Sequence, residues 1–314
     1  ISRGLVGSEM CIRDSMFAVP ILKSLYQNGY NISCVYTQPP QKSKRGQKIN
    51  KSPIQGISET LNLEYRTPPV LNNEEEYNFL NSLDVDLAIV VAYGQIIPKK
   101  FLNLTKKGFI NIHASLLSKW RGAAPIQRSI MNLDQETGIS IMRIAEKLDT
   151  GPVCNNYKIQ LNKNLNALEI SEKLSNLAAE KILDNVDDIL DGKANFIEQD
   201  HSNATYASKI QKTEGQINWD ENAEKIIGKI NGLYPSPGAF FMFNGERYKI
   251  LKAQVGRAQG NPGSVLSDNL EIACGNNQSI IINEIQRQGK RPQNIGEFIQ
   301  GSQIKNCLLY TSPS

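Results

Sequence analysis

An almost entirely apolar run from Leu87 to Tyr93 is the segment that most restricts what this chain can fold into. A strand that is apolar at every position needs cover on both faces, as it has inside a parallel sheet with helices on each side. The run ends at Gly94, a residue type common in turns. It therefore predicts an α/β fold.

Helical and strand patterns alternate on both sides of this run. We expect helices within residues 17–25, 54–61, 74–83, 98–104, 125–133 and 165–190, and strands within 32–37, 63–66, 108–113 and 137–144. This order predicts a Rossmann-like, mostly parallel sheet with helices on both faces. Ligands of such sheets bind at the carboxyl ends of the strands, so the loops after Tyr93 and His113 should face one crevice.

The pattern changes towards the C-terminus. Residues 193–206 are mostly polar and are typical of a linker, and later short strand-like runs alternate with turn signals such as Asn244-Gly245. Regular turn signals at this spacing indicate a small β-barrel or sandwich. We therefore expect an α/β domain over residues 16–192, a linker over 193–206 and a β domain over 207–306.

Composition limits the class of protein. With 314 residues, the chain exceeds the usual size of one hydrophobic core, and its 40% hydrophobic and 21% charged residues are ordinary for a globular protein. Since no apolar run is long enough to cross a bilayer, we expect a cytoplasmic protein. The net charge of +4 permits an anionic partner without requiring one. Cys34, Cys154 and Cys274 are too far apart to indicate a disulfide framework or a zinc site.

The two ends of the chain share an unusual relationship. One short DNA sequence can encode Met10–Ser15, and its reverse complement in a shifted frame encodes Cys307–Ser312. Inverted copies at both ends are typical of a translated sequencing adapter. We expect residues 1–15 and 307–314 to be non-native, adapter-derived segments, and the first strand of the sheet to be missing with the true start.

Asn111, His113 and Asp149 are the candidate catalytic residues. An amide can donate to a developing oxyanion, an imidazole can move a proton near neutral pH, and a carboxylate can orient and charge that imidazole. Asn111 and His113 lie two positions apart on one strand, so their side chains point to the same face. The alternatives are a packed core histidine and a turn aspartate. No GxGxxG or Walker pattern is present, which weakens a nicotinamide or ATP interpretation.

A basic loop follows the strand at residues 32–37. It combines prolines and a glycine with cations and no acid, and its cations are Lys42, Lys44, Arg45, Lys48 and Lys51. One interpretation is a solvated loop, and the other is an arm that contacts nucleic-acid phosphates. Proximity to an active site would decide between them.

Several motifs together resemble one family. They are Asn111–Gln127, Tyr36–Pro39, Val90–Gly94, Glu136–Gly138, Leu148–Gly151, Tyr206–Ile210 and Gly215–Trp219. These segments are similar to the methionyl-tRNA formyltransferases within the folate-dependent formyltransferase family, over nearly the whole chain between its ends. The run from Trp120 to Gln127 distinguishes the tRNA enzymes from their sugar-nucleotide relatives.

The resemblance implies roles for further residues. The expected contacts of the folate donor are Ser115, Leu116, Leu117, Ser118, Tyr93 and Gly94. Ser118 stands where the family usually has proline, so it lacks the fixed backbone angle of that residue. The C-terminal domain should be an oligonucleotide-binding (OB)-like barrel that binds tRNA, and the expected tRNA contacts of the basic loop are Lys42, Lys44, Arg45, Lys48 and Lys51. No metal is expected.

The activity implied is transfer of a formyl group from 10-formyltetrahydrofolate to the α-amine of methionyl initiator tRNA. Asn111 and protonated His113 would stabilise the oxyanion, and Asp149 would favour the protonated ring and help to manage the amine proton. Two alternatives stay open: a folate-dependent formyltransferase for a sugar-nucleotide or other small amine, and a noncatalytic RNA-binding protein. We expect a monomer with no membrane association and no obligate protein partner.

Overall fold

The computed structural model describes residues 3–8, 14–42, 49–301 and 304 of the chain, which form two compact units. The first unit holds the described residues up to Ala123, with Thr137–Ile159 and Ser171–Ala207. The second holds Ala124–Glu136, Gln160–Ile170 and the described residues from Ser208 onward. Residues 193–206, expected to form a linker, therefore pack within the first unit.

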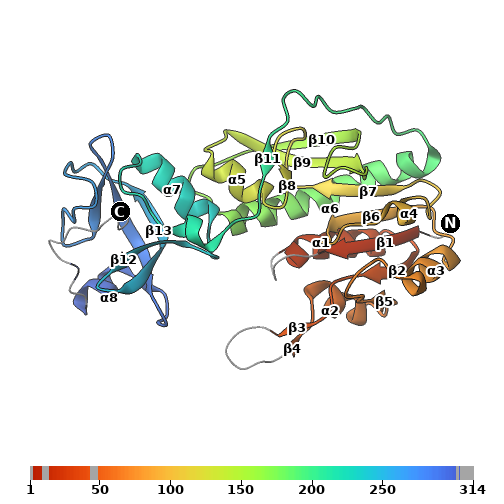
Figure 1. The fold of residues 1–314 in the computed structure, drawn as a ribbon, viewed down its shortest axis with the longest axis horizontal. Helices are drawn as coiled ribbons and strands as arrows, with labels where there is room; N and C mark the ends of the chain where they lie inside the picture. The colour runs from red at the N-terminus through yellow and green to blue at the C-terminus, as the bar shows by residue number, and fades with distance from the viewer. Residues whose placement is uncertain (1–2, 9–13, 43–48, 302–303, 305–314) are drawn as a thin grey trace. The chain divides into compact units, whose positions relative to one another are not determined.

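The first unit is built on a seven-stranded sheet of order β10-β9-β7-β6-β1-β2-β5 (Figure 1). Its strands are β1 (Arg3–Ser8), β2 (Ile32–Tyr36), β5 (Tyr65–Arg66), β6 (Ala88–Ala92), β7 (Phe109–His113), β9 (Glu136–Arg143) and β10 (Val153–Gln160). The pairs from β5 to β7 are parallel, and β9 runs antiparallel to β7. The predicted mostly parallel sheet is confirmed, although β10 was not foreseen.

Helices cover both faces of this sheet, and the residues of β6 are therefore buried on both sides. Ala88 and Val90 pack in one hydrophobic cluster with side chains of α3 (Glu74–Ser82) and α4 (Lys99–Leu102). Helix α1 (Asp14–Gln27) packs against β1 and β6. The apolar run from Leu87 to Tyr93 therefore has the double cover that its composition requires.

Two further helices complete the layers of the first unit. Most of α6 (Ala167–Asp191) belongs to this unit, and it is joined to α1 by hydrogen bonds from Ser175 Oγ to Phe17 O and from Ser24 Oγ to Ala179 O, each 2.7 Å long. Helix α2 (Pro53–Thr60) packs against α1 and is capped by Ser52, whose hydroxyl accepts from the Gln55 N–H.

Strand β1 occupies a position that we expected to be empty. Arg3–Ser8 lies between β2 and β6 and pairs in parallel with both, with Gly4 opposite Ala88 and Ser8 opposite Ala92. Parallel pairing uses backbone N–H and C=O groups, which any non-proline residue supplies. The expectation of a missing first strand was therefore wrong for this structure, whereas a non-native origin of residues 1–15 stays a prediction.

Two short pairings lie outside the large sheet. Strand β8 (Arg121–Gly122) pairs in parallel with β11 (Tyr206–Ala207), within the first unit. Strands β3 (Gln41–Lys42) and β4 (Ile49–Asn50) form an antiparallel pair at the base of the basic loop.

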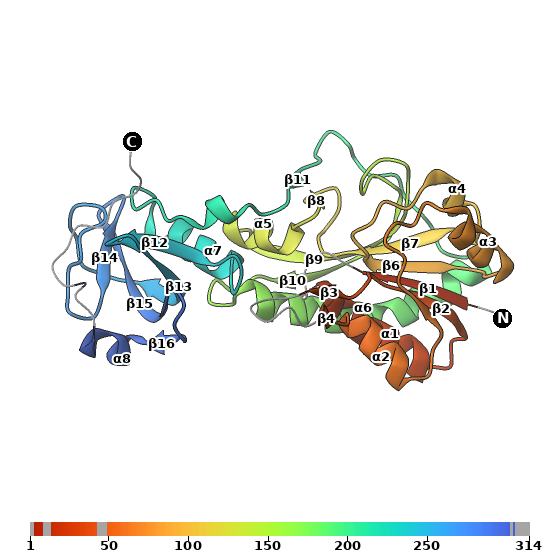
Figure 2. The ribbon, with the colours of Figure 1, turned by 60° about the horizontal axis from the view of Figure 1, so that its bottom comes forward.

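The second unit contains a sheet of order β12-β13-β15-β14, with β16 paired to β15. The strands are β12 (Ala239–Phe243), β13 (Glu246–Val255), β14 (Glu271–Cys274), β15 (Gln278–Arg287) and β16 (Gln293–Asn294), and the helices are α5 (Pro125–Met131), η1 (Lys212–Gly215), α7 (Ala223–Gly232) and α8 (Ile295–Gln300). The sheet is curled like half of a barrel (Figure 2), and among the described strands no β12–β14 pairing closes it. The predicted small β-barrel domain is therefore confirmed as a C-terminal β domain whose sheet forms half of a barrel.

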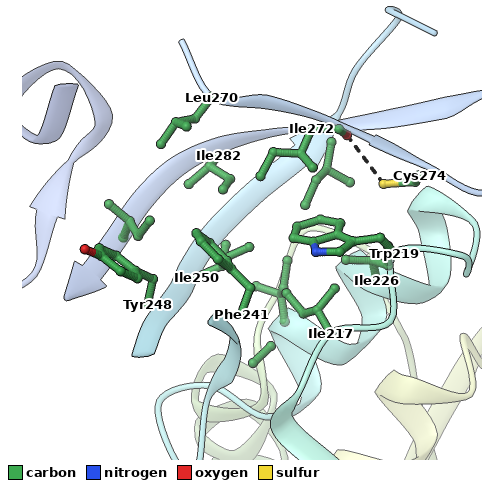
Figure 3. Packing of buried hydrophobic residues seen from close by; sticks show 14 of the residues in the cluster. Ile217, Trp219, Ile226, Phe241, Tyr248, Ile250, Leu270, Ile272, Cys274 and Ile282 are labelled. Atoms are coloured by element: carbon green, nitrogen blue, oxygen red, sulfur yellow. Dashed lines mark hydrogen bonds between the residues drawn. The ribbon is translucent and has the colours of Figure 1, made fainter. Parts of the chain in front are cut away.

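The core of the second unit lies between this sheet and α7. Trp219, Ile226 and Phe241 are almost fully buried there and lie together in Figure 3. The Phe241 ring also stacks on Tyr248, with centroids 5.5 Å apart. Among the helices that the structure describes, none has the length and apolar character needed to cross a membrane.

Candidate active site

Asn111 and His113 project from the same face of β7, two residues apart, as the sequence predicted. The antiparallel register with β9 sets Asn111 opposite Met142 and His113 opposite Ser140. The His113 side chain is 7% exposed. The strand therefore fixes the backbone of both residues and leaves their side chains to be oriented by neighbouring loops.

The His113 ring is held by the backbone of the following loop. Its Nε2 lies 2.9 Å from the Trp120 carbonyl oxygen. A carbonyl oxygen can only accept a hydrogen bond, so Nε2 carries the proton. The other ring nitrogen, Nδ1, faces the Asp149 carboxylate with Oδ2 at 3.7 Å. A proton on Nδ1 would be stabilised by that carboxylate.

Asp149 completes the cluster from the loop between β9 and β10. Its backbone is in the left-handed region, with φ of 50°. One carboxylate oxygen accepts from the Gly122 N–H at 2.8 Å, and the other accepts from Asn111 Nδ2 at 3.4 Å. The structure therefore brings together all three predicted catalytic residues. It also adds Gly122 as a backbone partner of the acid.

The predicted folate-binding segment Ser115–Ser118 is fastened by a buried serine. Ser140 Oγ accepts from the Leu117 N–H at 2.9 Å and donates to the Ser115 carbonyl at 2.6 Å. The Ser115 side chain is fully buried and donates to Lys119 O, whereas Leu116, Leu117 and Ser118 are half-buried. Ser115 therefore stabilises the loop from its buried side, and the three residues that follow are more accessible to a ligand.

Tyr93 and Gly94, the other predicted folate contacts, differ in exposure. The Tyr93 side chain is 2% exposed within the core, and burial raises the pKa of its hydroxyl. Its carbonyl accepts from Gln38 Nε2 at 3.2 Å. Gly94 is exposed and has a positive φ of 71°. A ligand would therefore meet Gly94 and the backbone here rather than the tyrosine ring.

The predicted tRNA-binding cations are only partly described. Lys42 lies in β3, whereas Lys44, Arg45 and Lys48 fall outside the described residues. Lys51 is exposed and pairs with Glu59 of α2 at 2.8 Å, and this hydrogen bond raises its pKa. Lys51 therefore has a partner within the protein, which its position in a basic run did not indicate.

Three residues beside the trio were not predicted from the sequence. Arg121 is 2% exposed, and its guanidinium donates to Gln199 Oε1 and to His201 Nδ1. Gln199 and His201 belong to the segment expected to be a linker. The available signal was the arginine inside the Trp120-Arg121-Gly122 motif, whose burial the sequence does not show. Nothing in the local sequence marked Gln199, because a polar residue in a polar stretch is typical of a loop.

Two family models match this chain. A formyl transferase model matches residues 11–186, and a formyl transferase C-terminal domain model matches residues 209–303. The chain belongs to the formyl transferase family. This formyl transferase carries the Asn111, His113 and Asp149 cluster inside the first matched segment.

Individual relatives agree with the family assignment. The methionyl-tRNA formyltransferase of Pelagibacter ubique is 68% identical over 92% of this chain and 93% of its own length. The methionyl-tRNA formyltransferase of Roseobacter denitrificans is 38% identical over 95% of this chain and 97% of its own. An N-formyltransferase from Helicobacter canadensis, solved with folinic acid and dTDP-3-aminofucose, has a TM-score of 0.69 at 16% identity and covers 90% of this chain and 99% of its own. That structure shows a shared fold.

The described residues of this formyl transferase contain no cluster of potential metal ligands. No group of three or more His, Cys, Asp or Glu side chains is placed there to hold a metal ion. The described cysteines Cys34, Cys154 and Cys274 are free thiols. Burial raises the pKa of Cys34 and of Cys274 to about 12, so neither thiol is a nucleophile near neutral pH.

Proposed function

We propose that this formyl transferase moves a formyl group from 10-formyltetrahydrofolate to the α-amino group of methionyl initiator tRNA. The observation that carries the choice of substrate is the 68% identity to the Pelagibacter ubique methionyl-tRNA formyltransferase over nearly the full length of both chains. The converging Asn111, His113 and Asp149 side chains support the reaction type, because they combine a donor, a proton carrier and a carboxylate.

In the proposed reaction, the neutral amine of the methionyl group attacks the formyl carbon of the folate. A carbon–nitrogen bond forms, and the carbonyl oxygen becomes an oxyanion. Asn111 Nδ2 donates to this oxygen, and His113 donates from Nδ1 once that atom is protonated, because Nε2 is already engaged by the Trp120 carbonyl. His113 therefore acts through the ring atom that faces Asp149.

Asp149 serves as the acceptor for the amine proton in this proposal. Its carboxylate is 12% exposed and is held by the Gly122 N–H, so it is oriented before the substrate arrives. As the tetrahedral intermediate collapses, the bond between the formyl carbon and N10 of the folate breaks, and N10 takes up a proton. The products are formylmethionyl-tRNA and tetrahydrofolate.

The folate donor is assigned to the loop Ser115–Ser118 and to Gly94, and the tRNA to the basic loop. Leu116, Leu117 and Ser118 are accessible enough to contact a ligand. Lys42, Lys44, Arg45, Lys48 and Lys51 supply positive charge that would contact acceptor-stem phosphates. We further propose that the enzyme is cytoplasmic and acts as a monomer without an obligate protein partner.

The deciding experiment compares amine acceptors with a single donor. The purified chain is incubated with 10-formyltetrahydrofolate and either methionyl initiator tRNA, free methionine or a dTDP-linked amino sugar, and formylated products are quantified. We expect formylation of the tRNA at a kcat/KM at least a hundredfold above that for the other acceptors. Preferred formylation of the amino sugar would establish the alternative, a sugar-nucleotide enzyme. No transfer to any acceptor would reject the proposed reaction.

A further inference from the structure

Arg121 is a buried cation with uncharged acceptors. Its side chain is among the largest that are almost fully buried, yet within the described residues the guanidinium bonds to neutral groups rather than to a carboxylate. Nε and Nη2 donate to Gln199 Oε1 at 3.0 and 2.7 Å, and Nη2 donates to His201 Nδ1 at 2.9 Å. A guanidinium can only donate, so His201 must be unprotonated at Nδ1. Burying a charge in this way is costly, which indicates a specific purpose.

Gln199 connects this guanidinium to the Asp149 loop by hydrogen bonds at both ends of its amide. Because its oxygen is occupied by Arg121, its amide nitrogen must face the other way. Both of its N–H groups are used, one to the Asp149 carbonyl at 2.9 Å and one to the Gly151 carbonyl at 2.7 Å. Asp149 has a left-handed backbone, which is unfavourable for a residue with a Cβ. The two hydrogen bonds from the Gln199 amide therefore help to hold the loop in this conformation.

The backbone around Arg121 touches the other two members of the cluster. The Trp120 carbonyl accepts from His113, and the Gly122 N–H donates to the Asp149 carboxylate. Pairing of β8 with β11 fixes this segment, with the Arg121 N–H bonded to Thr205 O at 2.8 Å. One short segment thus orients the histidine ring and the carboxylate by its backbone, and the aspartate loop by its side chain.

We infer that Arg121 is a positioning residue for the transfer reaction, acting through Gln199 to set the place of the Asp149 carboxylate relative to His113. This inference rests on the proposed function for its catalytic meaning. Neither residue touches the reacting atoms in this scheme. Their effect should therefore fall on kcat, because a displacement of a catalytic group by about 1 Å can cost about a hundredfold in rate.

Gln199→Glu and Arg121→Lys are the test variants. Gln199→Glu keeps the size and gives Arg121 a carboxylate partner, but removes the N–H donors to the Asp149 loop. Arg121→Lys keeps the charge but loses the planar fork that bonds Gln199 and His201 together. We expect each to lower kcat by about tenfold to a hundredfold with KM values for donor and tRNA changed less than threefold.

The matched control is Arg128→Lys in the second unit. Arg128 also uses its fork, on Glu214 and on the Ser208 carbonyl, but does not contact the trio. It should lower the unfolding midpoint with kcat within twofold of the native protein. If Arg121→Lys and Gln199→Glu behave like this control, with lower stability and unchanged kcat, the positioning role is rejected.

Two further readouts separate this inference from the proposed function. In a double-mutant cycle with Asp149→Asn, with slow transfer followed over long incubations, Gln199→Glu should cost less than threefold beyond the Asp149→Asn loss. Additive losses would overturn the inference. Crystal structures of the native and Gln199→Glu proteins supply a test that needs no activity: the Asp149 carboxylate should leave the Gly122 N–H in the variant. An unmoved carboxylate would also overturn it, whereas an inactive native protein would overturn the proposed function alone.

Discussion

At the scale of single residues, the His113 ring is oriented by a backbone carbonyl on one side and faces a carboxylate on the other, two contacts that a single aspartate provides in many enzymes. The Trp120 carbonyl fixes the Nε2 proton, and Asp149 faces Nδ1 from 3.7 Å. That distance is too long for a direct hydrogen bond. The carboxylate is therefore left with capacity for a proton from a substrate amine.

His113→Ala removes the proposed oxyanion donor and leaves the Trp120 carbonyl without its partner. We expect kcat to fall by about a hundredfold or more, because removal of one such donor from an active site typically costs that much. Single-turnover transfer to methionyl initiator tRNA would measure the chemical step directly. Native-like circular dichroism and folate affinity would show that the fold is intact, and unchanged kcat would contradict the role of His113.

At the scale of the secondary-structure elements, Gly138 in β9 sets how closely the loop Ser115–Ser118, proposed to bind the folate donor, approaches the sheet. A Cβ at this position would overlap the Tyr157 carbonyl of β10 and lie 2.6 Å from Leu116 Cδ2. The loop and the two strands are therefore packed too tightly for any side chain here. Gly138 is part of the Glu136-Thr137-Gly138 motif, and the close approach of Leu116 and Tyr157 explains why the motif has glycine at this position.

Gly138→Ala should push Leu116 and the loop away from β9. We expect a loss of about 1–3 kcal/mol in the free energy of unfolding, typical of overpacking, and a KM for the folate donor raised by at least fivefold. Denaturant titration and steady-state kinetics measure the two effects. Gly56→Ala in α2 is the control, since a Cβ there has no neighbour within 4 Å. Equal donor KM in both variants would remove Gly138 from the folate site.

Charge reversal tests the basic loop as an element. Replacing Lys42, Lys44, Arg45 and Lys48 with Glu should raise the KM for tRNA by at least tenfold and flatten its dependence on salt, because fewer counterions are released on binding. Folate affinity should stay unchanged. Reversal of the exposed Lys106 and Lys193 elsewhere in the first unit provides the control. Native tRNA kinetics in the loop variant would assign these cations to a solvated surface.

The elements differ in how far the sequence alone predicts them. Strand β7 and its two polar residues could be predicted because period-two alternation is a local property. The brace formed by Arg121 and Gln199 could not be predicted, since it joins residues far apart in sequence and one of them lies in a stretch that resembles a linker. The Asp149 turn was located correctly, but the hydrogen bonds by which the distant Gln199 amide helps to hold it could not be predicted.

At the scale of the whole molecule, each unit has its own core and its own acid-sensitive contacts. In the second unit, a hydrogen bond from the Arg128 guanidinium holds the pKa of the Glu214 carboxyl below its ordinary value. The folded state therefore binds this proton more weakly than the unfolded chain does. The resulting stability is present above the unfolded pKa and is lost as the pH falls through the folded pKa.

Acid should therefore weaken the second unit partly through Glu214. We expect the unfolding midpoint of the native protein to fall as the pH drops below about 4.5, the ordinary value for this group. In Glu214→Gln, stability should be lower at neutral pH and its acid dependence shallower. Thermal unfolding between about pH 3 and 7, a range that includes the protonated and the ionised form of a glutamate side chain, measures the pH dependence of the midpoint in both proteins. Parallel acid limbs in the two proteins would show that this carboxyl is not responsible.

The composition of the second unit also has a consequence for synthesis on the ribosome. Helix α5 leaves the ribosome early, but its partner α7 is made about a hundred residues later, and Gly228 and Gly232 of α7 allow close approach to Ile130, Leu133 and Met131. The hydrogen bonds from Gln199 to the Asp149 loop likewise form only after Gln199 has left the ribosome. Helix α5 can therefore pack against α7 only late in synthesis. A cut near residue 207 would separate α7 and the C-terminal sheet from α5, which belongs to the same unit.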